Sequence, residues 1–250
     1  MFNNHHYNAP GGSYSRLYAD MAEQTHLLIA GATGSGKSTV INGIINALLH
    51  DTPDDDRFYF IDLKRVELGD YRFLPHTLGY ADDIGSAKRV LQSALDTIEA
   101  RYRDMQRRRI KRYDGAHIYV IIDEFADLMT TAKKEVLPLI QRIGQIGRAA
   151  AVHIIAATQC PLATIIPTTV KVNFTAILGL RTATKAHSRN IIDRAGCEDL
   201  PDPRTTNTAY GYYQRGANTD LYQLPMVPEA ERMRLVDYWT NYSRPAWRVC

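Results

Sequence analysis

One segment constrains this chain more than any other: Gly31–Ser38 reads Gly-Ala-Thr-Gly-Ser-Gly-Lys-Ser and matches G-x-x-x-x-G-K-[ST] in full. It lies between an apolar run, His26–Ala30, that predicts a strand and a segment, Thr39–Leu49, that predicts a helix. The glycines let backbone N–H groups turn toward phosphate oxygens, and the helix adds the positive end of its dipole. Lys37 would reach the β- and γ-phosphates, and the Ser38 hydroxyl would ligate Mg²⁺. The predicted nucleotide-binding residues are Gly31, Ala32, Thr33, Gly34, Ser35, Gly36, Lys37, Ser38 and Thr39.

The rest of the chain alternates continuous apolar strands with helical patterns, of which Ile84–Met105 is the longest. Such alternation is typical of a parallel sheet that is covered on both faces. We therefore expect an α/β fold with a mostly parallel sheet flanked by helices, followed by a C-terminal hairpin and helix. The other predicted elements are the strands Phe58–Asp62, His117–Ile122, Val152–Ala157 and Phe174–Leu180, the helices Lys134–Arg148 and Ala186–Ala195, the hairpin Ala209–Gln214 with Thr219–Leu224, and the helix Glu229–Tyr242.

Composition bounds the class of protein. With 250 residues, 45% hydrophobic and 23% charged, the chain is an ordinary globular protein. No apolar run approaches the roughly 18 residues of a membrane span. The three cysteines are odd in number and widely spaced, which argues against a disulfide framework and favours a cytoplasmic protein. No linker divides the chain, so we expect a lead-in segment over residues 1–25 and a single domain over residues 26–250.

Two polar sites follow predicted strands. Asp123-Glu124 ends the apolar strand His117–Ile122, where two carboxylates are costly unless a cation compensates them. Asp123 would hold Mg²⁺ through water, and Glu124 would orient and deprotonate the attacking water; the alternative is that Glu124 only caps the following turn. Gln159 follows the strand Val152–Ala157, at the same edge of a parallel sheet, where its amide would sense the γ-phosphate unless it is a simple turn residue.

The adjacent glutamate favours a motor-type ATPase over a GTPase switch. The sequence also lacks an Asn-Lys-x-Asp element for guanine and a Leu-Ser-Gly-Gly stretch typical of transporter ATPases. A formal net charge of +3 indicates little about partners, but seven of the twelve residues in Arg101–Arg112 are basic. That run is either a solvated helix end or a binding surface.

Five segments, read in order, are similar to the motor domain of FtsK/SpoIIIE-type DNA translocases, within the HerA–FtsK branch of P-loop ATPases. The resemblance covers roughly residues 15–225 and implies a RecA-like core, a ring of six subunits with ATP at each interface, and double-stranded DNA in the central channel. The segments are His26–Ser38 (HLLIAGATGSGKS), Ile61–Leu68 (IDLKRVEL), Ile118–Met129 (IYVIIDEFADLM), Arg148–Gln159 (RAAAVHIIAATQ) and Ser188–Leu200 (SRNIIDRAGCEDL).

The resemblance also implies further site residues. The family's arginine finger falls on Arg148, with Arg142 as the nearest rival and a surface salt bridge as the alternative for either. Channel-facing loops fall around Cys160–Thr169 and on Lys185 and Arg189, which are spaced i, i+4 and on a helix project from one face. The alternative for Lys185 and Arg189 is a solvated helix face. Contacts of this kind go to phosphates and carry no sequence information, as a translocase requires.

Three departures from the family stand out. Cys160 replaces the arginine that usually follows Thr-Gln, Leu63 replaces a proline, and Pro201–Arg204 stands where a Gly-x-Gly-Asp segment is expected. The family's membrane-spanning, adjoining and winged-helix domains are also absent from the sequence. The chain is therefore interpreted as a bare motor, stand-alone in preference to an excised fragment.

Three functions follow from the sequence. The first is an ATP-driven double-stranded DNA translocase without strong sequence preference. The alternatives are a protein-export motor, which need not grip phosphates, and a nucleotide-gated coupling ring with little catalysis, against which Glu124 argues. DNA binding separates the first from the second, and steady-state ATPase activity separates both from the third.

Overall fold

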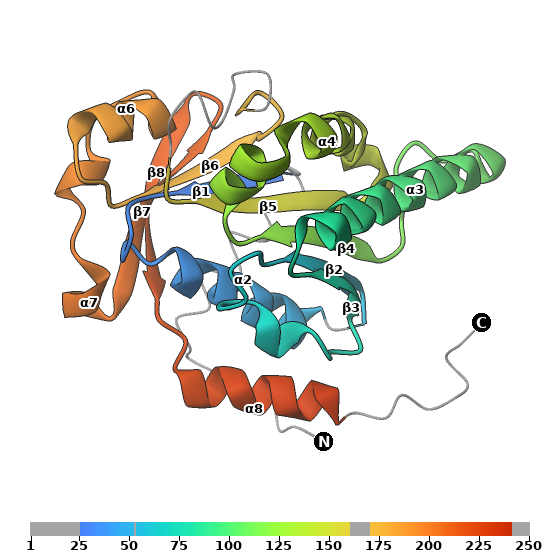
Figure 1. The fold of residues 1–250 in the computed structure, drawn as a ribbon, viewed down its shortest axis with the longest axis horizontal. Coiled ribbons are helices and arrows are strands. Elements are labelled where there is room, and N and C mark those ends of the chain that lie inside the picture. The colour runs from blue at the N-terminus through green and yellow to red at the C-terminus, as the bar shows by residue number, and fades with distance from the viewer. Residues whose placement is uncertain (1–25, 53, 161–170, 242–250) are drawn as a thin grey trace.

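A computed structural model describes residues 26–52, 54–160 and 171–241 of the chain. Within them, eight strands form one sheet in the order β3-β2-β4-β5-β1-β6-β7-β8 (Figure 1). The first six strands in chain order, β1 to β6, pair in parallel, and β7 and β8 add an antiparallel hairpin at one edge. The strands are β1 (His26–Ala30), β2 (Asp56–Ile61), β3 (Thr77–Ala81), β4 (His117–Ile122), β5 (Val152–Thr158), β6 (Ala176–Leu180), β7 (Thr208–Arg215) and β8 (Asn218–Pro225).

Helices cover both faces of the sheet. Figure 1 shows α3 and α4 on one face and α2 and α8 on the other. The α-helices are α2 (Lys37–Asp51), α3 (Ile84–Arg108), α4 (Phe125–Ile146), α6 (Lys185–Ile192), α7 (Pro203–Thr206) and α8 (Glu229–Thr240), and the 3₁₀ turns are η1 (Gly69–Tyr71), η2 (Arg148–Ala150) and η3 (Cys197–Asp199). None of the helices in the described ranges is long and apolar enough to cross a membrane.

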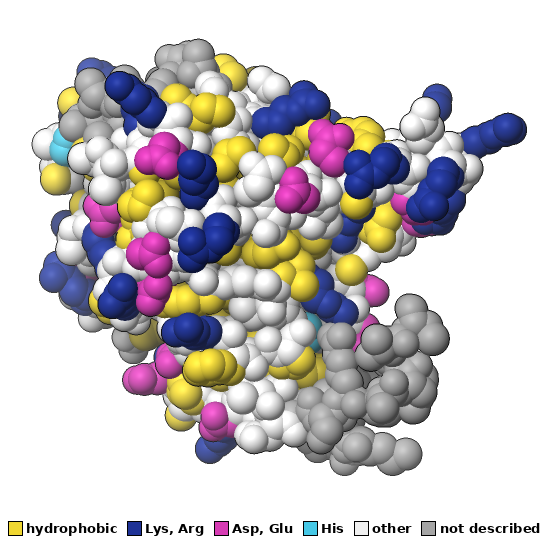
Figure 2. Space-filling model, turned by 45° about the vertical axis from the view of Figure 1, so that its right-hand side comes forward, with side chains coloured by type: hydrophobic (Ala, Val, Ile, Leu, Met, Phe, Trp, Pro, Cys, Tyr) yellow, Lys and Arg dark blue, Asp and Glu magenta, His cyan; other side chains and the backbone are white. Residues whose placement is uncertain are grey.

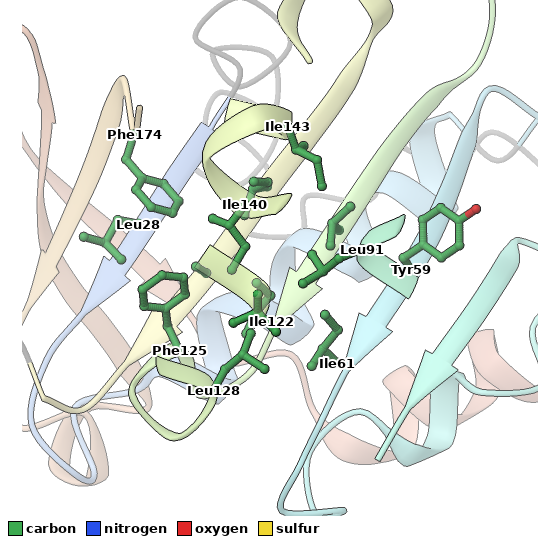
Figure 3. Packing of buried hydrophobic residues seen from close by; sticks show 14 of the residues in the cluster. Leu28, Tyr59, Ile61, Leu91, Ile122, Phe125, Leu128, Ile140, Ile143 and Phe174 are labelled. Carbon is green, nitrogen blue, oxygen red and sulfur yellow. The ribbon is translucent and has the colours of Figure 1, made fainter. Parts of the chain in front are cut away.

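Two apolar cores lie on either side of the sheet. One packs α3, α4 and α6 against the sheet, and the other packs α2 and α8 against its opposite face. In the first core, Ile122 at the end of β4 and Phe125 at the start of α4 are both buried, and the Phe125 ring meets Phe174 at 6.2 Å between centroids (Figure 3). The buried side chains of Ile122 and Phe125 therefore fix the backbone on either side of Asp123 and Glu124.

The predicted architecture is confirmed, and both ends of the helix predicted over Lys134–Arg148 are corrected. The helix predicted from Lys134 begins at Phe125, because Glu124 accepts an N–H from Ala126 and caps it. Its backbone leaves helical geometry at Ala132, so the helix predicted from Lys134 corresponds to the stretch after this break, and Pro138 lies near the start of that stretch, where proline is tolerated. The helix ends at Ile146, and Arg148 lies in the separate turn η2.

Candidate functional site

The phosphate loop joins β1 to α2 and has the backbone shape that its glycines predict. Gly34 and Gly36 have φ values of 73° and 94°, which side chains other than glycine rarely adopt. A Cβ on Gly31 would lie 2.5 Å from the Ser35 Oγ, so the loop closes tightly on itself. The Gly31 N–H donates to the Thr158 carbonyl at 3.2 Å, which ties the loop to the end of β5.

Lys37 is nearly buried within this loop. Its Nζ donates to the carbonyl oxygens of Gly31 at 2.9 Å and Ala32 at 2.8 Å. Burial lowers the pKa of Lys37 to about 8, although Glu124 and Asp123 favour its charged form. The ammonium is thus held by uncharged carbonyls and lies in the field of the acidic pair, where phosphate oxygens would compete for its donors.

Asp123 and Glu124 lie at the carboxyl edge of the sheet, as predicted. The Glu124 carboxylate is buried and accepts the Gln159 N–H at 3.1 Å through Oε1. Burial, followed by the nearby charges of Asp62, Glu67 and Glu124, raises the pKa of Asp123 to about 7. Several carboxylates therefore crowd an edge that lacks enough positive charge to compensate them.

This donor set fits a magnesium ion. The Asp123 carboxylate and the Ser38 hydroxyl, in the first turn of α2, are hard oxygen ligands. A divalent cation would offset both the burial and the repulsion that raise the pKa of Asp123. Among the described residues no group of three or more His, Cys, Asp or Glu side chains is arranged to hold a metal by itself. Mg²⁺ characteristically uses one or two protein ligands together with phosphate oxygens and waters.

Gln159 connects the phosphate loop to the acidic pair. Its side-chain Oε1 accepts the Thr33 hydroxyl at 2.7 Å, while its backbone N–H donates to Glu124. A residue predicted to sense the γ-phosphate is thus bonded to the loop on one side and to the predicted base on the other. Glu124 also caps α4 through the Ala126 N–H, so the capping alternative and the position beside Gln159 hold together.

Arg148 lies far from this edge. It is exposed in η2, immediately before β5, whereas the phosphate loop meets the other end of that strand. Its side chain makes no ion pair or hydrogen bond with any residue that the structure describes, whereas Arg142 lies 3.7 Å from Glu99. The structure therefore separates Arg148 from the other predicted catalytic residues.

Lys185 and Arg189 are both exposed on α6, whose first turn is capped by the Thr184 hydroxyl. Neither forms an ion pair within the described ranges. Of the predicted channel segment Cys160–Thr169, only Cys160 is among the described residues. In Pro201–Arg204, which differs from the family pattern, Arg204 is hydrogen-bonded to Asp202, and its guanidinium lies beside Gly34 of the phosphate loop.

Two site residues, Asp62 and Lys64, escaped the sequence prediction. The Asp62 carboxylate is fully buried and accepts the N–H groups of Glu67 at 3.0 Å and Leu68 at 2.9 Å. This shapes the loop in which the Lys64 Nζ lies 3.6 Å from Glu124 and 3.4 Å from Asp127. The available signal was an aspartate at the end of an apolar strand, the same pattern as Asp123.

Sequence comparison identifies close relatives. The model of the FtsK/SpoIIIE family matches residues 9–118 and 114–162. The DNA translocase FtsK of Chlorobaculum tepidum is 41% identical over 202 residues, which cover 72% of this chain and 25% of that protein. The DNA translocase FtsK of Haemophilus influenzae is 34% identical over 269 residues, which cover 92% of this chain and 50% of that protein. The chain thus spans about a quarter to a half of the length of these relatives.

Solved structures show the same fold. The pCW3 conjugation coupling protein TcpA, in a monomer form with ATPγS, matches with a TM-score of 0.75 at 22% identity, over 87% of this chain and 66% of that one. The cytoplasmic domain of the Thermomonospora curvata type VII secretion ATPase EccC matches with a TM-score of 0.69 at 21% identity, over 88% of this chain and 28% of that one. The predicted RecA-like P-loop ATPase fold is confirmed.

We expect Asp62→Ala to lower the free energy of unfolding by about 2 kcal/mol, because the buried N–H of Leu68 and the partly buried N–H of Glu67 lose their acceptor. Urea denaturation without nucleotide, followed by circular dichroism, measures the change. Glu99→Ala is the control, since it removes only the exposed pair with Arg142 and should cost no more than about 1 kcal/mol. Equal losses in the two variants would contradict the role given to Asp62.

Proposed function

The chain belongs to the FtsK/SpoIIIE family, and on that premise we propose that it is an ATP-hydrolysing motor that moves double-stranded DNA through a ring of six subunits, without strong sequence preference. Residues 26–250 act as one motor domain. The observation that carries this proposal is the meeting of Lys37, Glu124 and Gln159 at one edge of the sheet. DNA as the partner implies that the motor works in the cytoplasm.

ATP and Mg²⁺ are the proposed ligands of this edge. The phosphates would lie on the N–H groups of Gly31–Thr39, with Lys37 turning from its loop carbonyls to the β- and γ-phosphates. Ser38 and Asp123 would hold Mg²⁺, Asp123 through water. Bound magnesium would supply charge neutralisation at the β- and γ-oxygens.

Glu124 is the proposed general base. Its carboxylate is buried and held by the Gln159 and Ala126 N–H groups, so it is oriented before substrate arrives. It would take a proton from the water that attacks the γ-phosphorus, while the bond from that phosphorus to the β,γ-bridging oxygen breaks and ADP leaves. The Lys64 ammonium balances the charge of the Glu124 carboxylate from 3.6 Å. Gln159, bonded to Thr33, would report whether the γ-phosphate is present.

Arg148 is the proposed arginine finger, and its position supports action on a neighbour. Its own phosphate loop lies across the length of β5, at the opposite edge of the sheet. A guanidinium there reaches a γ-phosphate only in another subunit, where it would neutralise charge in the transition state. Arg142, engaged with Glu99, is the weaker candidate.

Lys185 and Arg189 are the proposed DNA contacts. They are exposed, carry no ion pair with a described residue, and project from one face of α6. Two like charges on one face are best balanced by a row of phosphates. A protein-export motor would not need these two cations, so DNA binding distinguishes a DNA translocase from a protein-export motor.

We expect Glu124→Gln to bind ATP and to hydrolyse it at least about a hundredfold more slowly, since the amide cannot accept the proton. Steady-state phosphate release with excess DNA measures turnover, and calorimetry measures ATP binding. Glu135→Gln, an exposed α4 carboxylate paired with Lys88, should leave both unchanged. Near-normal turnover of the Glu124 variant would remove it from this role.

The experiment for the whole proposal is ATP turnover with double-stranded DNA, single-stranded DNA and no DNA at low salt. We expect stimulation by double-stranded DNA. Equal turnover in all three samples would contradict a DNA motor, and absent DNA binding at about 50 mM salt would favour protein export.

We expect Lys185→Ala with Arg189→Ala to weaken DNA binding and to reduce the slope of log affinity against log salt by about 2, since each lost phosphate contact removes about 0.9. Fluorescence anisotropy between about 50 and 200 mM salt gives the slope. Lys88→Ala with Lys134→Ala removes the same charge from the α3 and α4 surface and should leave the slope unchanged. An unchanged slope in the α6 variant would exclude these two contacts.

A further inference from the structure

The basic run Arg101–Arg112 contains one residue that differs from the rest. Lys and Arg side chains gather at the projecting end of α3 (Figure 2), and Arg103, Arg107, Arg108, Arg109, Lys111 and Arg112 are all exposed. Arg101 is buried, with 9% of its surface exposed, and has no carboxylate partner among the described residues. A buried guanidinium without a counter-ion is costly and needs a structural reason.

Arg101 is bonded to three carbonyl oxygens. Its Nη1 donates to Ala150 at 2.7 Å and to Ala151 at 3.2 Å, and its Nη2 donates to Ala116 at 2.7 Å. The ring of Tyr113 lies 4.2 Å below its guanidinium carbon. The planar fork thus ties α3 to two segments at the amino edge of the sheet, which a lysine would not do.

The first of these segments carries Arg148. Ala150 is the last residue of η2, and Ala151 follows it with a left-handed φ of 54°. Two more bonds from the same region hold the turn: the Tyr113 N–H donates to Ala149 at 2.8 Å, and the Tyr102 hydroxyl donates to Ile146 at 3.0 Å. The backbone on both sides of Arg148 is therefore fixed from α3 and the turn after it.

We propose that Arg101 is a positioning residue for Arg148: by holding the carbonyls of Ala150 and Ala151 it fixes η2, so that the Arg148 side chain is presented to the phosphate site of the neighbouring subunit. The inference rests on the proposed function. A single 3₁₀ turn has weak internal hydrogen bonding, so its shape depends on such external contacts. Misplacing a catalytic group by about 1 Å costs up to about a hundredfold in rate.

The test begins with Arg101→Met, which keeps an unbranched apolar side chain but removes the guanidinium fork. We expect kcat for ATP to fall at least about tenfold, with KM for ATP within about twofold, because the phosphate loop of the variant is intact. Arg103→Met, an exposed member of the same run, is the matched control and should turn over like the unmodified chain. Normal kcat in Arg101→Met would overturn the inference.

A mixing experiment separates positioning from general damage. Arg101→Met keeps its own site but presents Arg148 poorly, whereas Glu124→Gln keeps Arg101 and Arg148 but lacks the base. Mixed rings should hydrolyse ATP faster than either variant alone, because Glu124→Gln subunits supply well-placed arginines. A misfolded Arg101→Met subunit would gain nothing from mixing, and the absence of rescue would reject the positioning role.

Arg148→Ala, mixed with Glu124→Gln in the same way, tests separately whether Arg148 is the arginine finger and whether Arg101 positions it. Normal turnover of Arg148→Ala would refute the proposed finger itself. The second outcome is that Arg148→Ala is impaired and is rescued by mixing, while Arg101→Met has normal turnover or is not rescued. That result would refute only the positioning role of Arg101. If Arg101→Met fails to fold, Tyr102→Phe takes its place, because this variant removes only the hydroxyl bond that holds the carbonyl of Ile146. Tyr102→Phe should show a smaller fall in kcat, which mixing rescues. A normal kcat in Tyr102→Phe would count against the inference.

Discussion

The rest of the site depends on the buried charge at the carboxyl edge of the sheet. The buried ammonium of Lys37 lies in the field of the carboxylates of Asp123 and Glu124, and burial disfavours the charged form of Lys37 and of Asp123. Such an arrangement is costly in a protein that needs only stability, since apolar side chains would fill the same space at lower cost. It becomes favourable when a magnesium-bound triphosphate supplies both signs of charge. The parallel strands provide the scaffold, because β1 and β5 end together, with Ala30 paired with Thr158, and β4 ends two residues earlier, with Ile122 paired with Ala156.

The sheet also divides the chemistry between its two edges. Everything that would bind and attack the nucleotide lies after the carboxyl ends of the strands, whereas Arg148 lies before β5. If Arg148 is the arginine finger, a subunit built this way would complete a catalytic site only together with another subunit. The proposed ring would then follow from the position of Arg148, and such a finger would require that η2 be held firmly. The contacts of Arg101 with η2 meet that requirement at the cost of burying a guanidinium.

The sequence predicts local features well and tertiary ones poorly. The phosphate loop, β1 and β4 could be predicted because their signals are contiguous. The start of α4 was missed because the break at Ala132 interrupts the apolar period, and β3 was missed because this edge strand is mostly half-exposed. Asp62 joins the site only through the pairing of Ile61 with Ile122, which no local pattern reveals. Arg101 looks like its six basic neighbours, and only burial distinguishes it.

The same helix that carries Arg101, α3, begins at the carboxyl edge of the sheet. The N-terminus of α3 is capped by Asp83, next to Asp82, which binds Arg65 in the loop that Asp62 shapes. From Ile84 to Arg101 the helix rises roughly 26 Å without a break, so a displacement of one end carries the other end with it. If the proposed function holds, a shift of the loop around Lys64 on hydrolysis would be transmitted along α3 to η2. The position of Arg148 at the neighbouring subunit's site would then depend on the nucleotide bound in its own subunit. Sequential hydrolysis around a ring requires such a dependence.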